Sequence, residues 1–167
     1  MKILRTLRFA SRVVAFCFNT IVCWFFFELS SLIFRNRSRI DAINTWVPRW
    51  ARINLWIFGV KVELHGPHVE EGRLYPRQGE NGTGRIFVAN HSSGLDIPIM
   101  FVVAEAHCIS RHDVADWPLI GPGAKRVGTL FVDRSSRKSG ASALKQVEEV
   151  LAKGEAVAMF PEGTVSP

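Results

Sequence analysis

Three short apolar runs, each followed at once by polar residues, constrain the fold of this chain more than any other feature. The runs cover residues 86–89, 129–132 and 156–160. Apolar runs of this length, bounded by turn residues, are typical of buried strands. Because helix-like patterns separate them, we expect an α/β fold with a mixed sheet flanked by helices. In such a sheet, the loops at the carboxyl ends of the strands carry the chemistry.

The first run leads directly into a histidine and an aspartate. His91 and Asp96 lie in the segment Asn-His-Ser-Ser-Gly-Leu-Asp that follows residue 89. An imidazole titrates near neutral pH and can serve as a general base, and a carboxylate bonded to its other ring nitrogen would fix its tautomer. We therefore expect His91 and Asp96 to be catalytic. The alternative is a loop histidine bonded to a neighbouring aspartate.

The second run begins after a glycine and ends in an arginine. Gly128 precedes this run and Arg134 follows it. The planar, permanently charged guanidinium of arginine can bind a phosphate through two donors, which orients the phosphate as well as holding it. We expect Arg134 to bind an acidic headgroup. The alternative is a surface arginine paired with Asp133.

The third run ends in Pro-Glu-Gly-Thr. Glu162 cannot bind a phosphate by charge, so we expect it to order the loop or to accept a hydrogen bond from a substrate hydroxyl. The amide of Gly163 can approach a substrate oxygen closely, because glycine has no side chain. The alternative for residues 161–163 is an ordinary turn.

The N-terminal part carries two helical patterns. Residues 13–34 form a long apolar run, and at about 1.5 Å per residue a helix of this length crosses the roughly 30 Å hydrocarbon core of a bilayer. Residues 41–58 have apolar residues at helical spacing, where Pro48 indicates a kink or the helix start and Gly59 its end. A carboxylate at mid-membrane is unfavourable, and a hairpin that enters one leaflet would leave Glu28 close to the headgroups, so a spanning helix and such a hairpin are both left open.

The positive charge is concentrated in the same region. Residues 1–60 hold nine basic and two acidic residues, a net charge of +7, whereas the rest of the chain has a net charge of −1. Four of the five tryptophans also lie there, a combination that suits an anionic membrane surface. No nucleic-acid module is present, so we expect a membrane partner and no nucleic acid. The expected domains are a membrane-anchoring segment, 1–59, and an α/β domain, 60–167. The alternative for 41–58 is a core helix of a soluble domain.

The cysteines and histidines indicate neither disulfides nor a metal site. Three cysteines cannot form a paired framework, which fits a catalytic domain that faces the reducing cytoplasm at the inner membrane. Two histidine-containing groups lack the spacing of a structural zinc site, so we expect no metal. They are His65 with His68, and His107 with Cys108 and His112. We do not expect a serine hydrolase, because no GxSxG motif occurs.

The remaining patterns predict shorter elements around the three runs. They are strands at 60–64 and 108–110 and helices at 96–104 and 143–151. Pro98 is tolerated in the first turn of its helix, and Gly154 is the expected stop of the last one. The glycine-rich segment 79–84 is expected to be a turn, because it lacks the lysine and hydroxyl of a phosphate-binding loop. Residues 117–123 are expected to break regular structure.

The order and spacing of the three blocks resemble those of the glycerophospholipid acyltransferase family. Residues 90–96 resemble its catalytic block, 128–134 its glycerol-phosphate block and 160–164 its acceptor-binding block, and 117–121 is similar to the segment between the first two. The resemblance implies that the catalytic residues are His91 and Asp96, and that the residues near the acceptor phosphate are Gly128, Arg134, Glu162 and Gly163.

Two departures from the family pattern stand out. Val165 occupies a position where many members have an arginine, which removes one possible cation from the headgroup site. The chain also stops where relatives continue, so we expect the C-terminal part of the family fold to be missing.

The resemblance implies an O-acyltransferase that moves an acyl group from an acyl thioester to the free hydroxyl of a lysophospholipid. The expected acceptor is 1-acyl-sn-glycerol-3-phosphate and the expected product is phosphatidic acid. The resemblance implies no cofactor apart from the co-substrate, which is acyl-CoA or acyl-acyl carrier protein. Two alternatives stay open: a different lysolipid acceptor, such as a lyso-aminolipid, and a catalytically silent, membrane-tethered module that binds lysolipid.

Overall fold

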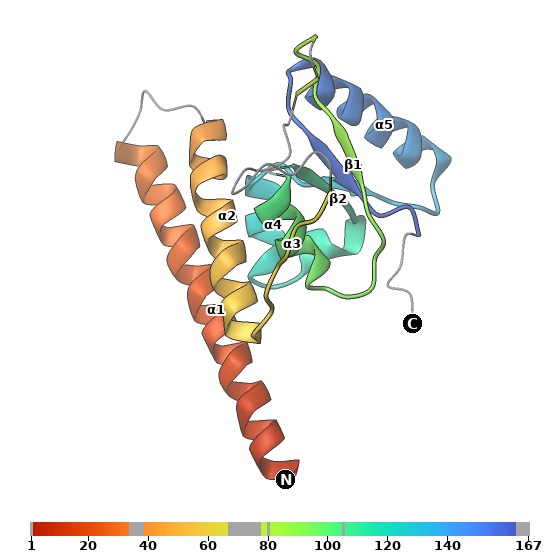
Figure 1. Cartoon of the computed structure of the whole chain (residues 1–167). Helices are drawn as coiled ribbons and strands as arrows, with labels where there is room; N and C mark the ends of the chain where they lie inside the picture. The colour runs from red at the N-terminus through yellow and green to blue at the C-terminus, as the bar shows by residue number, and fades with distance from the viewer. Residues whose placement is uncertain (1, 34–38, 67–77, 80, 105, 163–167) are drawn as a thin grey trace. The chain divides into compact units, whose positions relative to one another are not determined.

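The computed structural model describes residues 2–33, 39–66, 78–79, 81–104 and 106–162. The chain divides into two compact units, Met1–Glu63 and Leu64–Pro167. The first unit is helical, and the second contains a sheet flanked by helices (Figure 1).

The first unit is a pair of packed helices, α1 (Lys2–Ile33) and α2 (Arg39–Phe58). Both helices were predicted, and α1 begins well before the apolar run. Pro48 lies inside α2, so the option that this helix begins at Pro48 is wrong. Gly59 ends α2 with a φ of 74°, a left-handed conformation that glycine adopts without strain. By length and composition, α1 is able to cross a membrane.

Side-chain hydrogen bonds join α1 to α2. The indole Nε1 of Trp50 donates to the Thr20 hydroxyl at 3.0 Å, and Nδ2 of Asn19 donates to the Trp50 carbonyl at 3.2 Å. Farther along the same pair, Nε1 of Trp46 donates to the Ser30 hydroxyl at 3.1 Å. Such bonds between polar side chains fix the register of two helices, because each bond requires a particular pair of residues at the same height.

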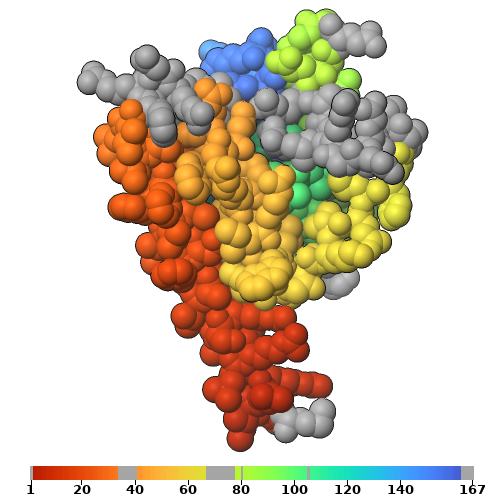
Figure 2. Space-filling model, turned by 60° about the vertical axis from the view of Figure 1, so that its left-hand side comes forward, coloured from red at the N-terminus to blue at the C-terminus, as the bar shows by residue number. Residues whose placement is uncertain are grey.

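Helix α1, whose surface is red to orange in Figure 2, carries many large apolar side chains that are exposed. This exposed apolar set consists of Ile3, Leu4, Leu7, Phe9, Val13, Val14, Phe18, Ile21, Phe25, Phe26, Leu32 and Ile33. Large exposed apolar surfaces mark sites of contact with a membrane or another protein.

The second unit is built on a four-stranded sheet in the order β1-β4-β2-β3. Its strands are β1 (Ile86–Val88), β2 (His107–Arg111), β3 (Leu130–Val132) and β4 (Val157–Met159). All neighbouring strands are parallel. The α/β class is confirmed, and the described strands form a parallel sheet where a mixed one was expected. Their carboxyl ends therefore meet at one edge of the sheet.

A helix packs on each face of this sheet. Cys108 and Ala158 are buried on the face that α3 (Asp96–Val103) covers. Val157 is buried on the other face, against α5 (Arg137–Ala152). Residues 157 and 158 thus point to opposite faces, as neighbouring residues of a strand must. The predicted helices at 96–104 and 143–151 and the predicted strand at 108–110 are confirmed.

The predicted strand at 60–64 is wrong. These residues form no strand, and the Val60 amide instead donates to the Leu55 carbonyl at 2.8 Å. The segment therefore begins by completing the end of α2, which satisfies a carbonyl that the helix itself leaves without a partner.

The predicted break at 117–123 is wrong in its second half, because Gly-Pro-Gly lies inside α4 (Ile120–Arg126). Pro122 occupies the first turn of this helix, where no helical amide bond is required. Gly121 packs against Ala115 so closely that a Cβ atom would lie 2.3 Å from the Ala115 carbonyl oxygen. Here glycine serves close packing and does not end the helix.

The glycine-rich segment 79–84 is a turn, as predicted. The Gly79 amide donates to the Thr83 carbonyl at 2.8 Å, and the Gly82 amide donates to the Gly79 carbonyl at 3.0 Å. A Cβ atom at Gly84 would lie 1.9 Å from the Glu155 carbonyl oxygen. The turn is therefore pressed against the connection between α5 and β4.

Candidate active site

His91 and Asp96 are in direct contact at the carboxyl end of β1. Nδ1 of His91 lies 2.9 Å from Oδ2 of Asp96, and the two side chains are 17% and 19% exposed. An ionised carboxylate only accepts hydrogen bonds, so Nδ1 carries the proton, and Nε2 of the neutral imidazole keeps its lone pair. Nε2 takes no hydrogen bond from the residues that the structure describes. The pair therefore presents a base with one occupied and one open nitrogen.

The loop before α3 holds the carboxylate of Asp96. Its Oδ2 accepts from the Ser92 and Ser93 amides at 2.7 and 2.8 Å. Partial burial alone would raise the pKa of Asp96, but hydrogen bonds from the Ser93 amide, the His91 ring and the Ser92 amide outweigh it, so the pKa lies below its ordinary value of 3.8. Asp96 is thus a fixed carboxylate at neutral pH, which an orienting group must be.

Strand β4 brings the third block beside His91, because β4 is the neighbour of β1. The Phe160 ring stacks on the His91 imidazole, with ring centroids 4.4 Å apart and planes inclined by 22°. Oε2 of Glu162 accepts a hydrogen bond from the His91 amide at 3.1 Å. Glu162 thus ties the first block to the third, and the aromatic stack restrains the imidazole.

Arg134 also lies at the carboxyl ends of the strands, but it follows β3, the strand farthest from β1. It is exposed and follows β3, with β2 and β4 between that strand and β1. At about 4.8 Å per strand, the ends of β1 and β3 are about 14 Å apart. The alternative pairing of Arg134 with Asp133 is not seen in the described part of the chain. The Asp133 carboxylate instead accepts from the amide and hydroxyl of Ser135 at 2.9 and 2.6 Å.

Gly128 lies at the other end of the strands, just before the amino end of β3. Its carbonyl contacts Nδ1 of His107 at 3.1 Å. Its φ is 81°, and a Cβ atom there would lie 2.9 Å from the same nitrogen. The structure therefore does not bring Gly128 together with His91 and Asp96, and glycine is needed there for the turn. Gly163 lies outside the described residues.

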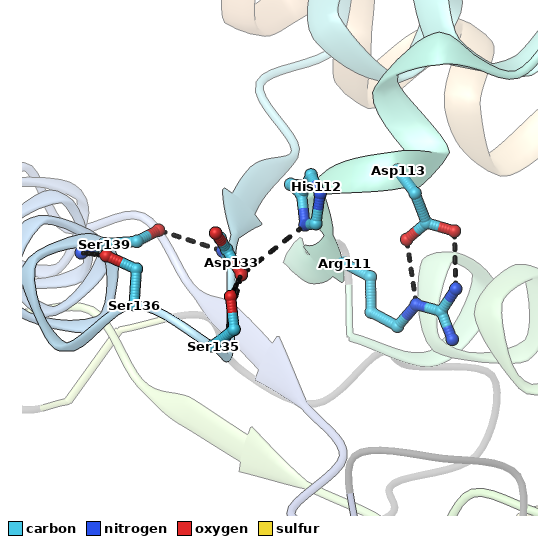
Figure 3. A network of polar contacts seen from close by, with 7 residues as sticks. All are labelled: Arg111, His112, Asp113, Asp133, Ser135, Ser136 and Ser139. Carbon is cyan, nitrogen blue, oxygen red and sulfur yellow. Dashed lines mark hydrogen bonds and ion pairs between the residues drawn. The ribbon is translucent and has the colours of Figure 1, made fainter.

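A polar network at the ends of β2 and β3 was not anticipated (Figure 3). His112, the first residue of a 3-10 helix, η1 (His112–Asp116), places Nδ1 3.9 Å from Oδ1 of Asp133. Arg111 forms two bonds to the Asp113 carboxylate, from Nε at 2.8 Å and from Nη2 at 2.5 Å. The signal was present in the sequence, because charged residues also follow the apolar run at 108–110.

Cys108 is a buried cysteine of β2. Burial raises the pKa of the Cys108 thiol to about 12, so this thiol stays protonated and is a poor nucleophile. No group of three histidine, cysteine, aspartate or glutamate side chains that could hold a metal ion occurs in the part of the chain that the structure describes.

Known proteins with similar sequences carry acyltransferase names. The family model described as Acyltransferase matches residues 61–167. The chain is 33% identical over 122 residues to a lyso-ornithine lipid O-acyltransferase of Rhizobium meliloti (strain 1021), covering 72% of this chain and 38% of that protein. It is 35% identical over 98 residues to a 1-acyl-sn-glycerol-3-phosphate acyltransferase of Neisseria gonorrhoeae, covering 59% and 37%. The chain thus spans less than half the length of these relatives.

One solved structure has a similar fold. It is the crystal structure of the 1-acyl-sn-glycerophosphate (LPA) acyltransferase PlsC from Thermotoga maritima, with a TM-score of 0.57 and 22% sequence identity. The match covers 93% of this chain and 64% of that chain. The family match includes the whole sheet together with His91 and Asp96. The chain therefore belongs to the glycerophospholipid acyltransferase family.

Proposed function

We propose that this protein transfers an acyl group from an acyl thioester to the free hydroxyl of a lysolipid. The observation that carries the proposal is the 2.9 Å contact between His91 Nδ1 and Asp96 Oδ2, which leaves Nε2 as an open base at the carboxyl edge of a parallel sheet. A neutral hydroxyl is a weak nucleophile near pH 7, so a base must take its proton as the new bond forms.

In the proposed reaction, Nε2 of His91 takes the proton while the hydroxyl oxygen attacks the carbonyl carbon of the thioester. The Asp96 carboxylate stabilises the positive charge that develops on the imidazole. When the tetrahedral intermediate collapses, the carbon–sulfur bond breaks and the imidazole returns the proton to the departing thiolate. The products are a diacyl lipid and a free thiol, and no covalent enzyme intermediate is needed.

The proposed acceptor is 1-acyl-sn-glycerol-3-phosphate, and the proposed product is phosphatidic acid. Arg134 supports this acceptor, because it is an exposed cation at the same edge as His91. The name of the Neisseria relative agrees with it. A lyso-ornithine lipid is the second candidate, which the name of the Rhizobium relative favours. The donor in the proposal is acyl-CoA or acyl-acyl carrier protein.

The α1–α2 hairpin supports a membrane location, because lysolipid acceptors lie in a bilayer. Its exposed apolar set covers much of α1, and basic residues precede and follow the apolar run. Such a segment binds an anionic bilayer through apolar burial and charge together. In the proposal, the hairpin holds the second unit at the cytoplasmic face of the inner membrane.

The test is incorporation of a labelled acyl group into a panel of lysolipids by the full chain in lipid vesicles. His91→Ala is expected to lower the rate by about 10²- to 10⁴-fold, the contribution of a general base. The matched control is His65→Ala, which replaces an exposed histidine outside the site and should leave the rate unchanged. Circular dichroism verifies that both variants fold.

Equal incorporation by the wild type and His91→Ala would contradict the proposed base. Lysolipid binding by a wild type that transfers no acyl group would instead favour the silent binding module.

A further inference from the structure

We propose that His112 is a specificity-determining residue of the acceptor site, where its imidazole binds the anionic group of the lysolipid headgroup. That group is a phosphate or a carboxylate, since both present oxygen acceptors with negative charge. The inference rests on the proposed acyl transfer and extends it to a residue outside the three blocks.

The register of the strands puts His112 in line with the candidate catalytic residues. The paired residues nearest the carboxyl edge are Val88 with Met159, Cys108 with Ala158, and Arg111 with Val132. His91 follows β1, Glu162 follows β4, His112 follows β2 and Asp133 follows β3, so all four residues lie at the carboxyl ends of neighbouring strands.

Two contacts beyond the strand ends agree with this alignment. The His91 amide donates to Oε2 of Glu162 at 3.1 Å, and Nδ1 of His112 lies 3.9 Å from Oδ1 of Asp133 (Figure 3). At about 4.8 Å per strand, the end of β2 is about 10 Å from the end of β1, and the end of β3 is about 14 Å away. A lysolipid with its hydroxyl at His91 and its headgroup near Arg134 therefore passes over His112.

The fold makes little use of His112. Its side chain is 63% exposed, and a separation of 3.9 Å from Asp133 is too long for a hydrogen bond. Exposed ion pairs of this kind contribute little to stability. Asp133 is held by Ser135 instead, through both the amide and the hydroxyl. Replacement of His112 should therefore leave the loop after β3 in place.

Arg111, the cation next to His112, is already paired with a carboxylate. Arg111 donates from two nitrogens to the two carboxylate oxygens of Asp113, and these hydrogen bonds lower the pKa of Asp113. His112 has no such partner within hydrogen-bond distance among the described residues. With Nδ1 directed at Asp133, its Nε2 is left for a ligand, and a charged imidazole donates from both nitrogens. The proposed complex holds the His112 imidazolium between Asp133 and the headgroup anion.

The experiment measures acyl transfer by the full chain in mixed micelles with three acceptors. Lysophosphatidic acid carries a phosphate, a lyso-ornithine lipid carries a carboxylate and an ammonium group, and monoacylglycerol carries no anion. His112→Ala is expected to raise the KM for the two anionic acceptors about three- to tenfold, with kcat within about twofold of the wild type. The KM for monoacylglycerol should not change, and His112→Arg should restore most of the affinity for the anionic acceptors.

The wild-type kcat/KM shows whether the site prefers a phosphate or a carboxylate headgroup, because the better acceptor has the larger value. An unchanged KM for both anionic acceptors would overturn the inference, as would an equal rise for monoacylglycerol. If the wild type transfers no acyl group, the proposed function fails, and the dissociation constant for lysophosphatidic acid in the same micelles decides this inference. Weaker binding by His112→Ala with recovery in His112→Arg supports it, and equal binding by all three proteins refutes it.

Discussion

Two hydrogen-bonded histidine–carboxylate pairs of the second unit lie at opposite ends of the strands, and they differ in what the second ring nitrogen of the histidine contacts. His91 meets Asp96 at 2.9 Å, and His107 meets Glu155 at 2.5 Å. Both pairs are similarly buried, with side chains 17% and 19% exposed in the first and 16% and 18% in the second. However, His107 also contacts the Gly128 carbonyl through its other nitrogen.

A histidine with both nitrogens in contact with protein acceptors leaves neither nitrogen open to a substrate. His107 instead links three segments: the start of β2, the turn before β3 and the connection from α5 to β4. His91 has one nitrogen fixed by a carboxylate and the other open among the described residues. Burial beside a carboxylate therefore does not distinguish a structural histidine from a catalytic one, whereas the second nitrogen does.

Removing the carboxylate from each pair gives the largest predicted contrast in activity. Asp96→Asn should lower acyl transfer by roughly a thousandfold, because an amide does not hold His91 in the required tautomer or stabilise its charge. Glu155→Gln, the matched change at the other edge, should leave turnover per folded molecule nearly unchanged. Rates normalised to the folded fraction measure this contrast, and comparable losses in both variants would erase the distinction between the two pairs.

For stability the contrast should be reversed, because the His107 pair should matter more to the fold than to activity. His107→Gln is expected to lower the free energy of unfolding by about 1–3 kcal/mol, since partly buried acceptors on two segments lose their donor. Chemical denaturation of the full chain in detergent measures the loss, with the exposed-site change His65→Gln as control. A variant as stable as the wild type would show that the His107 contacts do not stabilise the fold.

Arg134 adds a smaller effect at the edge that carries His91. Arg134→Ala should raise the KM for a phosphate-bearing acceptor about tenfold, because a charge-assisted hydrogen bond is lost. The KM for the acyl donor should stay the same. Arg137→Ala, which replaces an exposed arginine at the start of α5, is the control. A greater loss of donor affinity than of acceptor affinity would argue against the proposed role.

The smallest effect is the pH dependence of stability at Asp96. Its pKa in the folded protein lies below 3.8, so the ionised carboxylate stabilises the fold above that pH, and this contribution is lost as the pH falls through the folded-state pKa. The difference in unfolding free energy between the wild type and Asp96→Asn should therefore shrink under acid. Urea titrations from neutral to acid pH measure the difference, and a constant value would contradict the hydrogen-bonded carboxylate.

Local patterns predicted which residues would follow the strands. The apolar runs placed His91, Arg134 and Glu162 at strand ends, and the structure puts all three at one edge. The order of the strands was not predictable in this way, because β4 pairs with β1 through residues about 70 positions apart. Because of that order, Glu162 is a neighbour of His91, whereas Arg134 follows β3, the strand farthest from β1.

The same limit explains the residues whose roles were missed. His107 entered the sequence argument only as a possible metal ligand, and its partners Gly128 and Glu155 are distant in sequence. At Pro48 the local pattern left two options, a kink inside the helix or the helix start, and the structure places Pro48 inside α2, which packs against α1. Contacts between distant segments decide these cases, and no short pattern contains them.

The protonation of the two histidines tests the central claim most directly. Nitrogen NMR of the full chain in micelles reports which ring nitrogen carries a proton, with signals assigned from the His91 and His107 variants. In the neutral imidazole, His91 should carry its proton on Nδ1 and none on Nε2. A proton on Nε2 of His91 would contradict the account, because that nitrogen could not then take the proton of a lysolipid hydroxyl.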